Sequence, residues 1–177
     1  MKTPLFVLSL LVAATTITGT TQAATTGSLR FTGNIEGGTC NLDPFDVSRL
    51  IELPPVKVSD FNSSNSAGLR TFNLTANCDA DIRNVTFTFN GTPASSGQYF
   101  ANIGGTATGV ATAIQSRIGG VASNIPANGN AADRGRTIPT SAGKAVLPMG
   151  AEYRKIVIGS VTKGTLSTTI SVTITYN

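Results

Sequence analysis

The sequence predicts an all-β protein, an antiparallel β-sandwich folded as one domain. Apolar and polar side chains alternate with a period of two in several segments, as they do in strands that bury one face. Turn residues such as Asn, Gly and Ser separate these segments, and no segment carries a convincing helical period. The 177 residues are also rich in Thr and contain one pair of cysteines, which indicates a sandwich of immunoglobulin-like size. Because the chain has no Trp to pack on a disulfide, the antibody-type topology is not expected.

The composition excludes several classes of function. The chain has no His, so catalysis by imidazole and His-ligated metal sites are excluded. It has 13 Lys and Arg against 9 Asp and Glu, a net charge of +4, and the basic residues are scattered along the chain. Scattered basic residues do not form a phosphate-binding surface, so no nucleic acid partner is expected. We predict no cofactor, no metal and no catalytic residue.

The first residues indicate export. Lys2 precedes an apolar run from Pro4 to Ala14, and Thr21-Gln22-Ala23 has the small-x-small pattern of a secretory cleavage site. The apolar run is too short to span a bilayer, and nothing after it resembles a helix on which a buried N-terminal helix could pack. We therefore predict a signal peptide over residues 1–23 and an exported mature chain. No later segment approaches the ~18 apolar residues of a membrane helix, so membrane insertion is not expected.

The two cysteines are predicted to form a disulfide. In an oxidising compartment a lone pair is most simply a bridge, and a metal site would need further ligands that only carboxylates could supply here. The bridge Cys40–Cys78 consumes both thiols, so a Cys nucleophile is not expected.

Strand predictions follow from the alternation. Residues 72–78 place Cys78 on the apolar face of one strand, and residues 85–90 form a second strand that stops at Asn90-Gly91. Two weaker pieces, Ile51 to Leu53 and Val56 to Val58, are interrupted by Pro54-Pro55, which indicates an edge strand or a strand that switches sheets. Further candidates span residues 109–118, 144–149 and 153–161, and residues 119–136 are predicted as a long loop.

The two ends of the mature chain are its most informative parts. The last segment, residues 168–177, has the cleanest strand pattern, with alternating apolar residues Ile170, Val172, Ile174 and Tyr176. Near the other end, Leu29, Phe31, Gly33 and Ile35 alternate with polar residues just before Cys40. From periodicity alone, this segment could simply be the first strand of a self-contained sandwich.

An ordered set of motifs resembles the pilins of chaperone–usher fimbriae, especially type 1-like shaft subunits. The set combines an export signal, an N-terminal Gly-x-x-x-Phe-x-Gly pattern, one cysteine pair and a penultimate Tyr. It comprises Gly27-Ser28-Leu29-Arg30-Phe31-Thr32-Gly33-Asn34-Ile35, Gly37-Gly38-Thr39 before Cys40, Phe72-Asn73-Leu74 leading into Cys78, and Thr173-Ile174-Thr175-Tyr176-Asn177.

This resemblance implies an incomplete immunoglobulin-like β-sandwich that a donor strand from a neighbouring subunit completes. A donor-strand extension over residues 24–36 then precedes a pilin domain over residues 37–177. The donor strand would carry Gly27, Leu29, Phe31, Gly33 and Ile35. The strand that borders the acceptor groove and meets the chaperone would carry Ile170, Val172, Ile174 and Tyr176.

The implied function is that of a structural subunit of a surface fimbria supporting cell adhesion. The implied partners are other pilin subunits joined head to tail as a homo- or hetero-polymer, a periplasmic chaperone and an outer-membrane usher. The implied route is export through the periplasm to the bacterial cell surface. A minor adaptor or tip subunit with a receptor-binding role is the alternative, although the chain has no room for the extra lectin domain of a two-domain tip adhesin.

A secreted enzyme or inhibitor on a complete sandwich is a weaker alternative. Ser141 and Lys144 could be imagined as a nucleophile pair, but nothing in the sequence supplies an oxyanion hole or a supporting partner. Arg134, Arg136 and Lys144 are interpreted as a solvated basic loop.

Overall fold

The computed structural model describes residues 28–156 and 160–177. The chain divides into an N-terminal segment that ends at Ile35 and a compact domain from Glu36 to Asn177. The predicted signal peptide lies outside the described residues. Within them, no helix is both long enough and apolar enough to cross a membrane.

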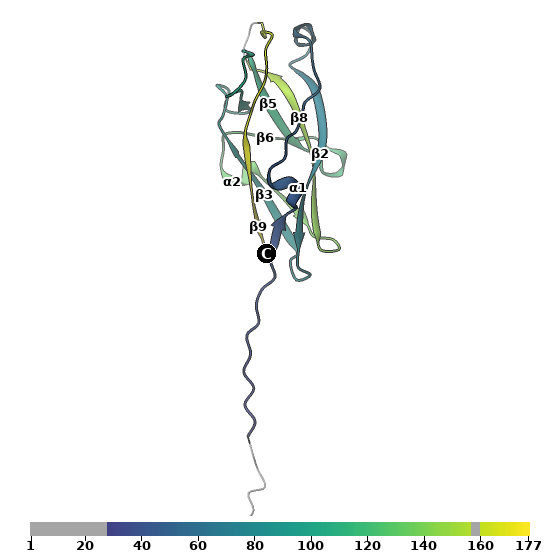
Figure 1. Cartoon of the computed structure of the whole chain (residues 1–177), viewed down its shortest axis with the longest axis vertical. Helices are drawn as coiled ribbons and strands as arrows, with labels where there is room; N and C mark the ends of the chain where they lie inside the picture. The colour runs from purple at the N-terminus through teal and green to yellow at the C-terminus, as the bar shows by residue number, and fades with distance from the viewer. Residues whose placement is uncertain (1–27, 157–159) are drawn as a thin grey trace, which may run out of the picture. The chain divides into compact units, whose positions relative to one another are not determined.

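The domain is a sandwich of two antiparallel sheets, as predicted (Figure 1). The larger sheet has the strand order β1-β2-β8-β5-β4, with β6 also paired to β5, and the smaller sheet has the order β7-β3-β9. The strands are β1 (Cys40–Leu42), β2 (Ser66–Cys78), β3 (Asn84–Gly91), β4 (Phe100–Ala101), β5 (Val110–Ser116), β6 (Ser123–Ile125), β7 (Gly135–Pro139), β8 (Lys144–Lys155) and β9 (Ile170–Tyr176).

The helices are single turns between strands. They are α1 (Pro44–Val47), α2 (Ala131–Arg134) and the 3₁₀ turns η1 (Val58–Phe61) and η2 (Ile118–Gly120). Asp43 caps α1, its carboxylate accepting from the Phe45 N–H at 3.1 Å, and Pro44 opens the turn. These turns agree with the absence of a helical period in the sequence.

The core lies between the two sheets and follows the predicted alternation. On β3, Val85, Phe87 and Phe89 are buried while their neighbours are partly exposed. On β8, Ala145, Leu147 and Met149 alternate in the same way. Burying one full aliphatic or aromatic side chain stabilises a fold by about 1.5–3 kcal/mol, so these two strands carry much of the domain's hydrophobic stabilisation.

Most strand predictions are confirmed, with changes in extent. Residues 72–78 lie in the longer β2, residues 85–90 lie in β3, and residues 109–118 contain β5. The segments 144–149 and 153–161 are not separate strands, because β8 runs without a break from Lys144 to Lys155. Residues 157–159 of the second segment lie outside the described residues. The predicted loop 119–136 contains β6, α2 and the start of β7.

The prediction of strand pieces at Ile51–Leu53 and Val56–Val58 is wrong. Residues 48–57 form no strand, and Val58 begins the η1 turn instead. Pro54 and Pro55 lack backbone N–H groups, which explains why the segment does not join a ladder. Ile51, Leu53 and Val56 are nonetheless half-buried between exposed neighbours, so the alternation reflects packing against the body of the domain.

Candidate functional site

One side of strand β9 is the candidate functional site, and we call it the open edge. It consists of Ile170, Val172, Ile174 and Tyr176, the four residues to which the resemblance in sequence assigned an acceptor role. β9 pairs with β3 over its whole length, from Gly91 opposite Ile170 to Val85 opposite Tyr176. Because β9 ends the smaller sheet, its other side has no partner strand among the described residues.

The register shows which backbone groups face the open edge. In an antiparallel pair, residues alternate between those that exchange both hydrogen bonds with the partner strand and those that point their N–H and C=O away from it. Asn177 N–H donates to the carbonyl of Asn84 at 3.3 Å, and its own carbonyl accepts from the Arg83 N–H at 2.9 Å. Counting back by twos, Thr175, Thr173 and Ser171 face β3.

The backbone groups of Ile170, Val172, Ile174 and Tyr176 therefore point away from β3. No backbone hydrogen bond to these four residues on that side is recorded within residues 28–156 and 160–177. Unpaired strand edges are templates for pairing with another chain, which makes this edge a site for strand addition.

The side chains of the open edge are incompletely covered. Ile170, Val172 and Ile174 pack against the main core, yet each remains half-buried, and Tyr176 is 43% exposed. Beside β9 in the same sheet, Phe87 of β3 lies opposite Ile174 and is fully buried. Leu42 and Leu53, which come from β1 and the irregular segment after it, are also partly buried against the same cluster. An added strand would therefore find both main-chain partners and apolar side chains to cover.

The N-terminal segment carries the predicted donor residues. Considered by itself, residues 28–35 form no helix or strand. The side chains of Leu29, Phe31 and Ile35 are 85%, 89% and 102% exposed, and a Cβ added at Gly33 would meet no atom within 4 Å. Gly27 lies outside the described residues. Among the described residues, the first strand is β1 at Cys40.

The predicted disulfide is confirmed. Cys40 and Cys78 are bonded across 38 residues of sequence and lie directly opposite each other in the β1–β2 ladder. Cys40 is buried in the main core cluster. The bridge therefore holds the first residue of β1, the point where the chain enters the sandwich.

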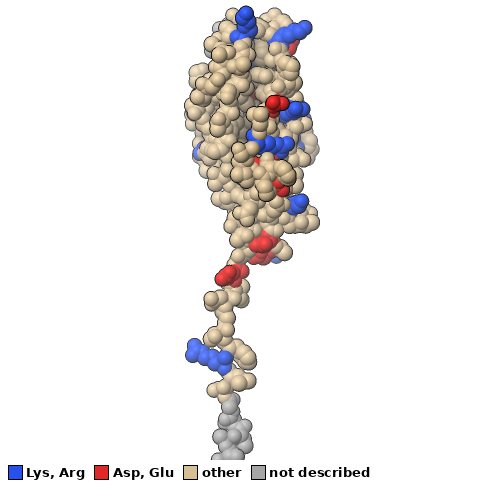
Figure 2. Space-filling view, viewed as in Figure 1, with Lys and Arg blue, Asp and Glu red and all other residues tan. Residues whose placement is uncertain are grey.

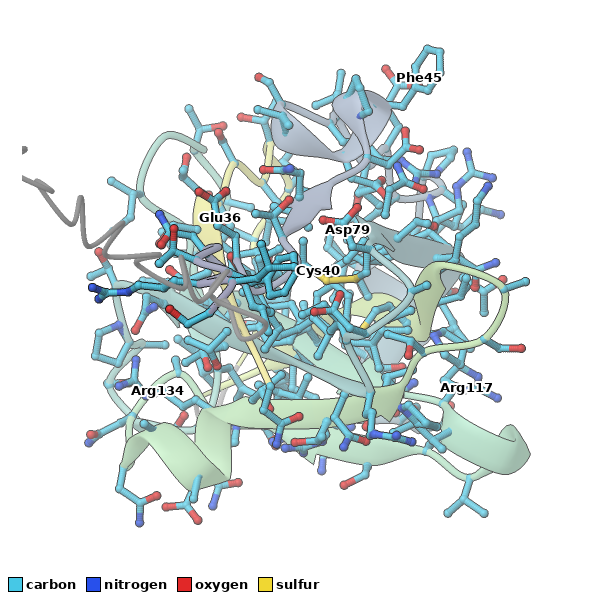
Figure 3. The ribbon with its side chains drawn as sticks, turned by 90° about the horizontal axis from the view of Figure 1, so that it is seen from below. Glu36, Cys40, Phe45, Asp79, Arg117 and Arg134 are labelled. Atoms are coloured by element: carbon cyan, nitrogen blue, oxygen red, sulfur yellow. A yellow bond between two sulfur atoms is a disulfide. The ribbon has the colours of Figure 1, made fainter. Side chains whose placement is uncertain are left out.

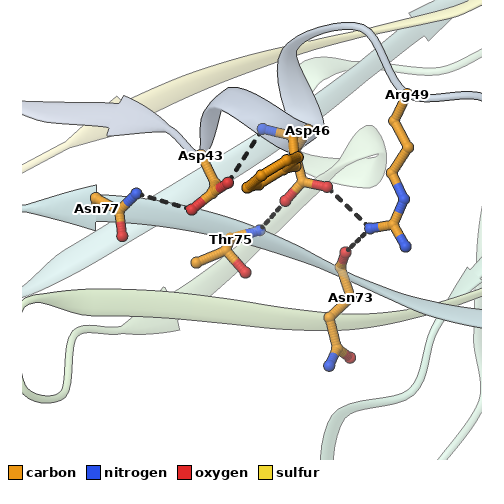
Figure 4. A network of polar contacts seen from close by, with 7 residues as sticks. Asp43, Asp46, Arg49, Asn73, Thr75 and Asn77 are labelled. Atoms are coloured by element: carbon orange, nitrogen blue, oxygen red, sulfur yellow. Dashed lines mark hydrogen bonds and ion pairs between the residues drawn. The ribbon is translucent and has the colours of Figure 1, made fainter.

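A polar network that the sequence patterns did not indicate fixes the chain after β1 (Figure 4). The Asp46 carboxylate accepts from the Thr75 N–H at 2.8 Å and pairs with Arg49 at 2.9 Å. Arg49 also donates to the Asn73 carbonyl at 2.8 Å. These side-chain bonds replace the β1–β2 ladder beyond Leu42 and hold residues 43–49 against β2.

Asp43 belongs to the same network. Its carboxylate accepts from the side-chain amide of Asn77 at 3.1 Å and from the Phe45 N–H, and these two bonds lower the pKa of Asp43. The sequence signal for this turn is the Asp-Pro pair at 43–44, which is typical of a helix N-terminus.

The interpretation of Arg134 and Arg136 as part of a solvated basic loop is wrong, because both side chains make hydrogen bonds within the domain. Arg136 donates to the Ser116 hydroxyl at 3.0 Å and to the Asn124 carbonyl at 2.7 Å, and so ties β7 of one sheet to the β5–β6 hairpin of the other. Burial lowers the pKa of Arg136. Arg134 donates to the Gly129 carbonyl at 3.1 Å and to the Asn90 side chain. Lys144 is exposed, as interpreted.

The face shown in Figure 2 is mostly uncharged, with single acidic and basic side chains dispersed over it. A hollow of about 490 Å³ lies between residues 49–52 and 70–72, but Arg49 is held by Asp46, and Arg70 donates to the Glu52 carbonyl at 3.1 Å. No group of three or more His, Cys, Asp or Glu that could hold a metal ion occurs in the part of the chain described.

Comparison with known proteins agrees with this architecture. The family model described as "Fimbrial protein" matches residues 29–177. The search of curated proteins gives no match to the sequence.

Among solved structures, the P pilus rod subunit PapA is similar, with a TM-score of 0.63 and 21% identity over 78% of this chain and 99% of PapA. A structure of a chaperone–usher pilus, described in connection with rod uncoiling, gives a TM-score of 0.64 and 19% identity over 89% of this chain and 99% of the other. The CupB6 tip adhesin of Pseudomonas aeruginosa gives 0.59 and 18% over 71% of this chain, which spans only 35% of the adhesin. At these identities the likeness shows the fold.

Proposed function

Because the chain belongs to the fimbrial protein family, with its family match over residues 29–177, we propose that it is a shaft subunit that polymerises by donor-strand exchange. Members of this family are subunits of chaperone–usher pili, which assemble from pilin subunits at the cell surface. The proposal concerns how this chain joins its neighbours: residues 27–35 of one subunit add as a strand to the open edge of β9 in the next.

The observation that carries this proposal is the open edge itself. It combines outward backbone groups with half-buried apolar side chains at Ile170, Val172 and Ile174. Residues 27–35, which we call the arm, offer the complement, since Leu29, Phe31 and Ile35 alternate with polar residues and a strand presents such residues on one face. Main-chain hydrogen bonds and burial of alternate side chains are the two parts of strand-addition recognition.

Head-to-tail addition explains why the product is a filament. The donor and acceptor surfaces lie on different parts of one chain, so each added subunit presents a new acceptor edge. Heterologous contacts of this kind build open assemblies when the rotation between copies does not close a ring. An uncovered acceptor edge would pair nonspecifically, so we propose that a periplasmic chaperone covers the same edge before assembly at an outer-membrane usher.

The subunit is proposed to be structural and without catalytic activity. Both cysteines are in the disulfide, so neither thiol is available as a nucleophile. The similarity to a tip adhesin keeps a minor adaptor or tip position as the second candidate. Immunogold labelling of fimbriae distinguishes the two, because a shaft subunit is labelled along the whole filament and a tip subunit only at its end.

Deletion of residues 24–35 tests the proposed role of the arm. The signal peptide stays in place, so export is kept, and the acceptor edge at residues 170–176 is unchanged. We expect the truncated subunit to be recovered with its chaperone at normal yield but to add no further subunit through its own N-terminus. Filaments assembled from the truncated subunit alone, observed by electron microscopy, would contradict the proposal.

A further inference from the structure

The residues just before β1 are held by two carboxylates from the turn between β2 and β3. The Gly38 N–H donates to the Asp81 carboxylate at 2.7 Å, and the Thr39 N–H donates to the Asp79 carboxylate at 2.7 Å. The Thr39 hydroxyl also reaches Asp79 at 3.1 Å, and the Asp79 N–H returns a bond to the Thr39 carbonyl at 2.9 Å. Bonds from N–H groups to carboxylates are among the stronger hydrogen bonds in proteins.

The adjacent glycines Gly37 and Gly38 differ in their surroundings and mark the N-terminal limit of the backbone that these carboxylates fix. A Cβ added at Gly38 would overlap the Asp81 carboxylate and lie 2.7 Å from the Asp79 Cβ. A Cβ added at Gly37 would meet no atom within 4 Å. The Asp81 carboxylate and the Asp79 Cβ therefore leave no room for a side chain at position 38, whereas Gly37 faces open space.

The residues on the N-terminal side are not held in this way. Glu36 and Gly37 are exposed, and neither makes a hydrogen bond within the described residues. On the other side, Cys40 is fixed by the disulfide, and Figure 3 shows Asp79 close beside that bridge. The carboxylates therefore extend the fixed backbone from Cys40 back to Gly38.

We propose that Asp79 and Asp81 form a backbone clamp that positions the base of the arm, and that the clamp limits the joint between successive subunits to Glu36 and Gly37. Without the clamp, Gly38 and Thr39 would join the flexible linker and double its length from two residues to four. A longer Gly-rich linker samples a wider range of end-to-end vectors. The positional role rests on the proposed function, but the clamp itself does not.

Gly38→Ala and Gly37→Ala make a matched pair of variants, since both exchange a glycine for alanine and alter the unfolded chain alike. In the full-length chain held by its chaperone, Gly38→Ala should speed hydrogen–deuterium exchange at amides 38 and 39 by about tenfold or more, the effect of one lost charge-assisted bond. Gly37→Ala should leave both rates unchanged. Asp81→Ala, which keeps Gly38, should speed exchange at amide 38. Equal rates in all four proteins would overturn the clamp.

The joint is measured in a purified complex of two linked subunits with one spin label on each. Gly38→Ala or Asp81→Ala in the subunit that donates its arm should widen the distribution of label distances by about 1.4-fold, because the end-to-end distance of a flexible linker grows with the square root of its length. The same substitutions in the accepting subunit should leave the width of the distance distribution unchanged. A general loss of stability would instead widen the distribution whichever subunit carried the substitution. Unchanged widths would overturn the positioning role. If the wild-type chain forms no such complex, the proposed function fails, and amide exchange still decides the clamp.

Discussion

A fusion protein that carries a second copy of residues 27–35 after Asn177, through a flexible linker, should melt at least about 10 °C above the unfused chain. The added strand would cover the open edge within the same molecule. Burial of Leu29, Phe31 and Ile35 is worth about 5–9 kcal/mol before ordering costs, and ladder bonds to β9 add to it. A net gain of a few kcal/mol corresponds to a shift of this size, at about 2–4 °C for each kcal/mol.

The matched control is the same fusion protein with Leu29, Phe31 and Ile35 of the added copy replaced by Ser. It keeps the linker and the backbone but loses the apolar face, so its melting temperature should return close to that of the unfused chain. A second control places a bulky Leu at Gly33 of the copy. If the apolar and polar copies stabilise the domain equally, or if neither does, the open edge is not an acceptor for this strand.

Loss of the disulfide has the second largest expected effect. The double variant Cys40→Ala/Cys78→Ala should lower the free energy of unfolding by about 4 kcal/mol, the loop-closure value for a bridge of this span. The bridge spans 38 residues and anchors β1, which has only three residues in its ladder with β2. Urea unfolding of the oxidised fusion protein, with and without the two substitutions, measures this difference.

Reduction supplies the control for the disulfide prediction. A reducing agent should destabilise the fusion protein with intact cysteines by a similar amount and leave the double variant unaffected. That pattern separates the loss of the cross-link from the loss of cysteine packing in the core, where Cys40 is buried. A decrease below about 1 kcal/mol would mean that the unfolded chain is little constrained by the bridge.

The sequence predicted the fold well wherever alternation was regular and local. The strands at residues 72–78, 85–90 and 168–177 were found because one face of each packs on the core. The disulfide was predicted because two cysteines in an exported chain most simply form a bridge. The open edge could be assigned only through family resemblance, since β9 has the same alternation whether one of its sides or both are paired.

The segment at residues 48–57 was predicted wrongly for a physical reason. Ile51, Leu53 and Val56 alternate as strand residues do, because an extended chain lying on a core also buries every second side chain. Backbone pairing is a separate requirement, and Pro54 and Pro55 cannot meet it. An alternation of apolar and polar residues indicates that one face of the segment is buried. It does not by itself indicate that the backbone pairs with a neighbouring strand.

The polar contacts could not be predicted because they join residues far apart in sequence. Arg136 bonds to Ser116 and Asn124, and Asp46 bonds to the backbone of Thr75, which lies 29 residues away. The clamp on Gly38 and Thr39 likewise depends on carboxylates that lie 43 and 40 residues further along the chain. The sequence around a charged residue does not indicate which distant residue it will bond to.

Amide exchange along β9 shows directly whether the open edge accepts a strand of residues 27–35. A synthetic peptide of residues 27–35 is added to the subunit, and exchange is followed residue by residue from Ile170 to Tyr176. We expect the amides of Ile170, Val172, Ile174 and Tyr176 to become protected, while those of Ser171, Thr173 and Thr175, already bonded to β3, change little. Unchanged exchange at the four open-edge amides with saturating peptide would contradict strand addition at the open edge.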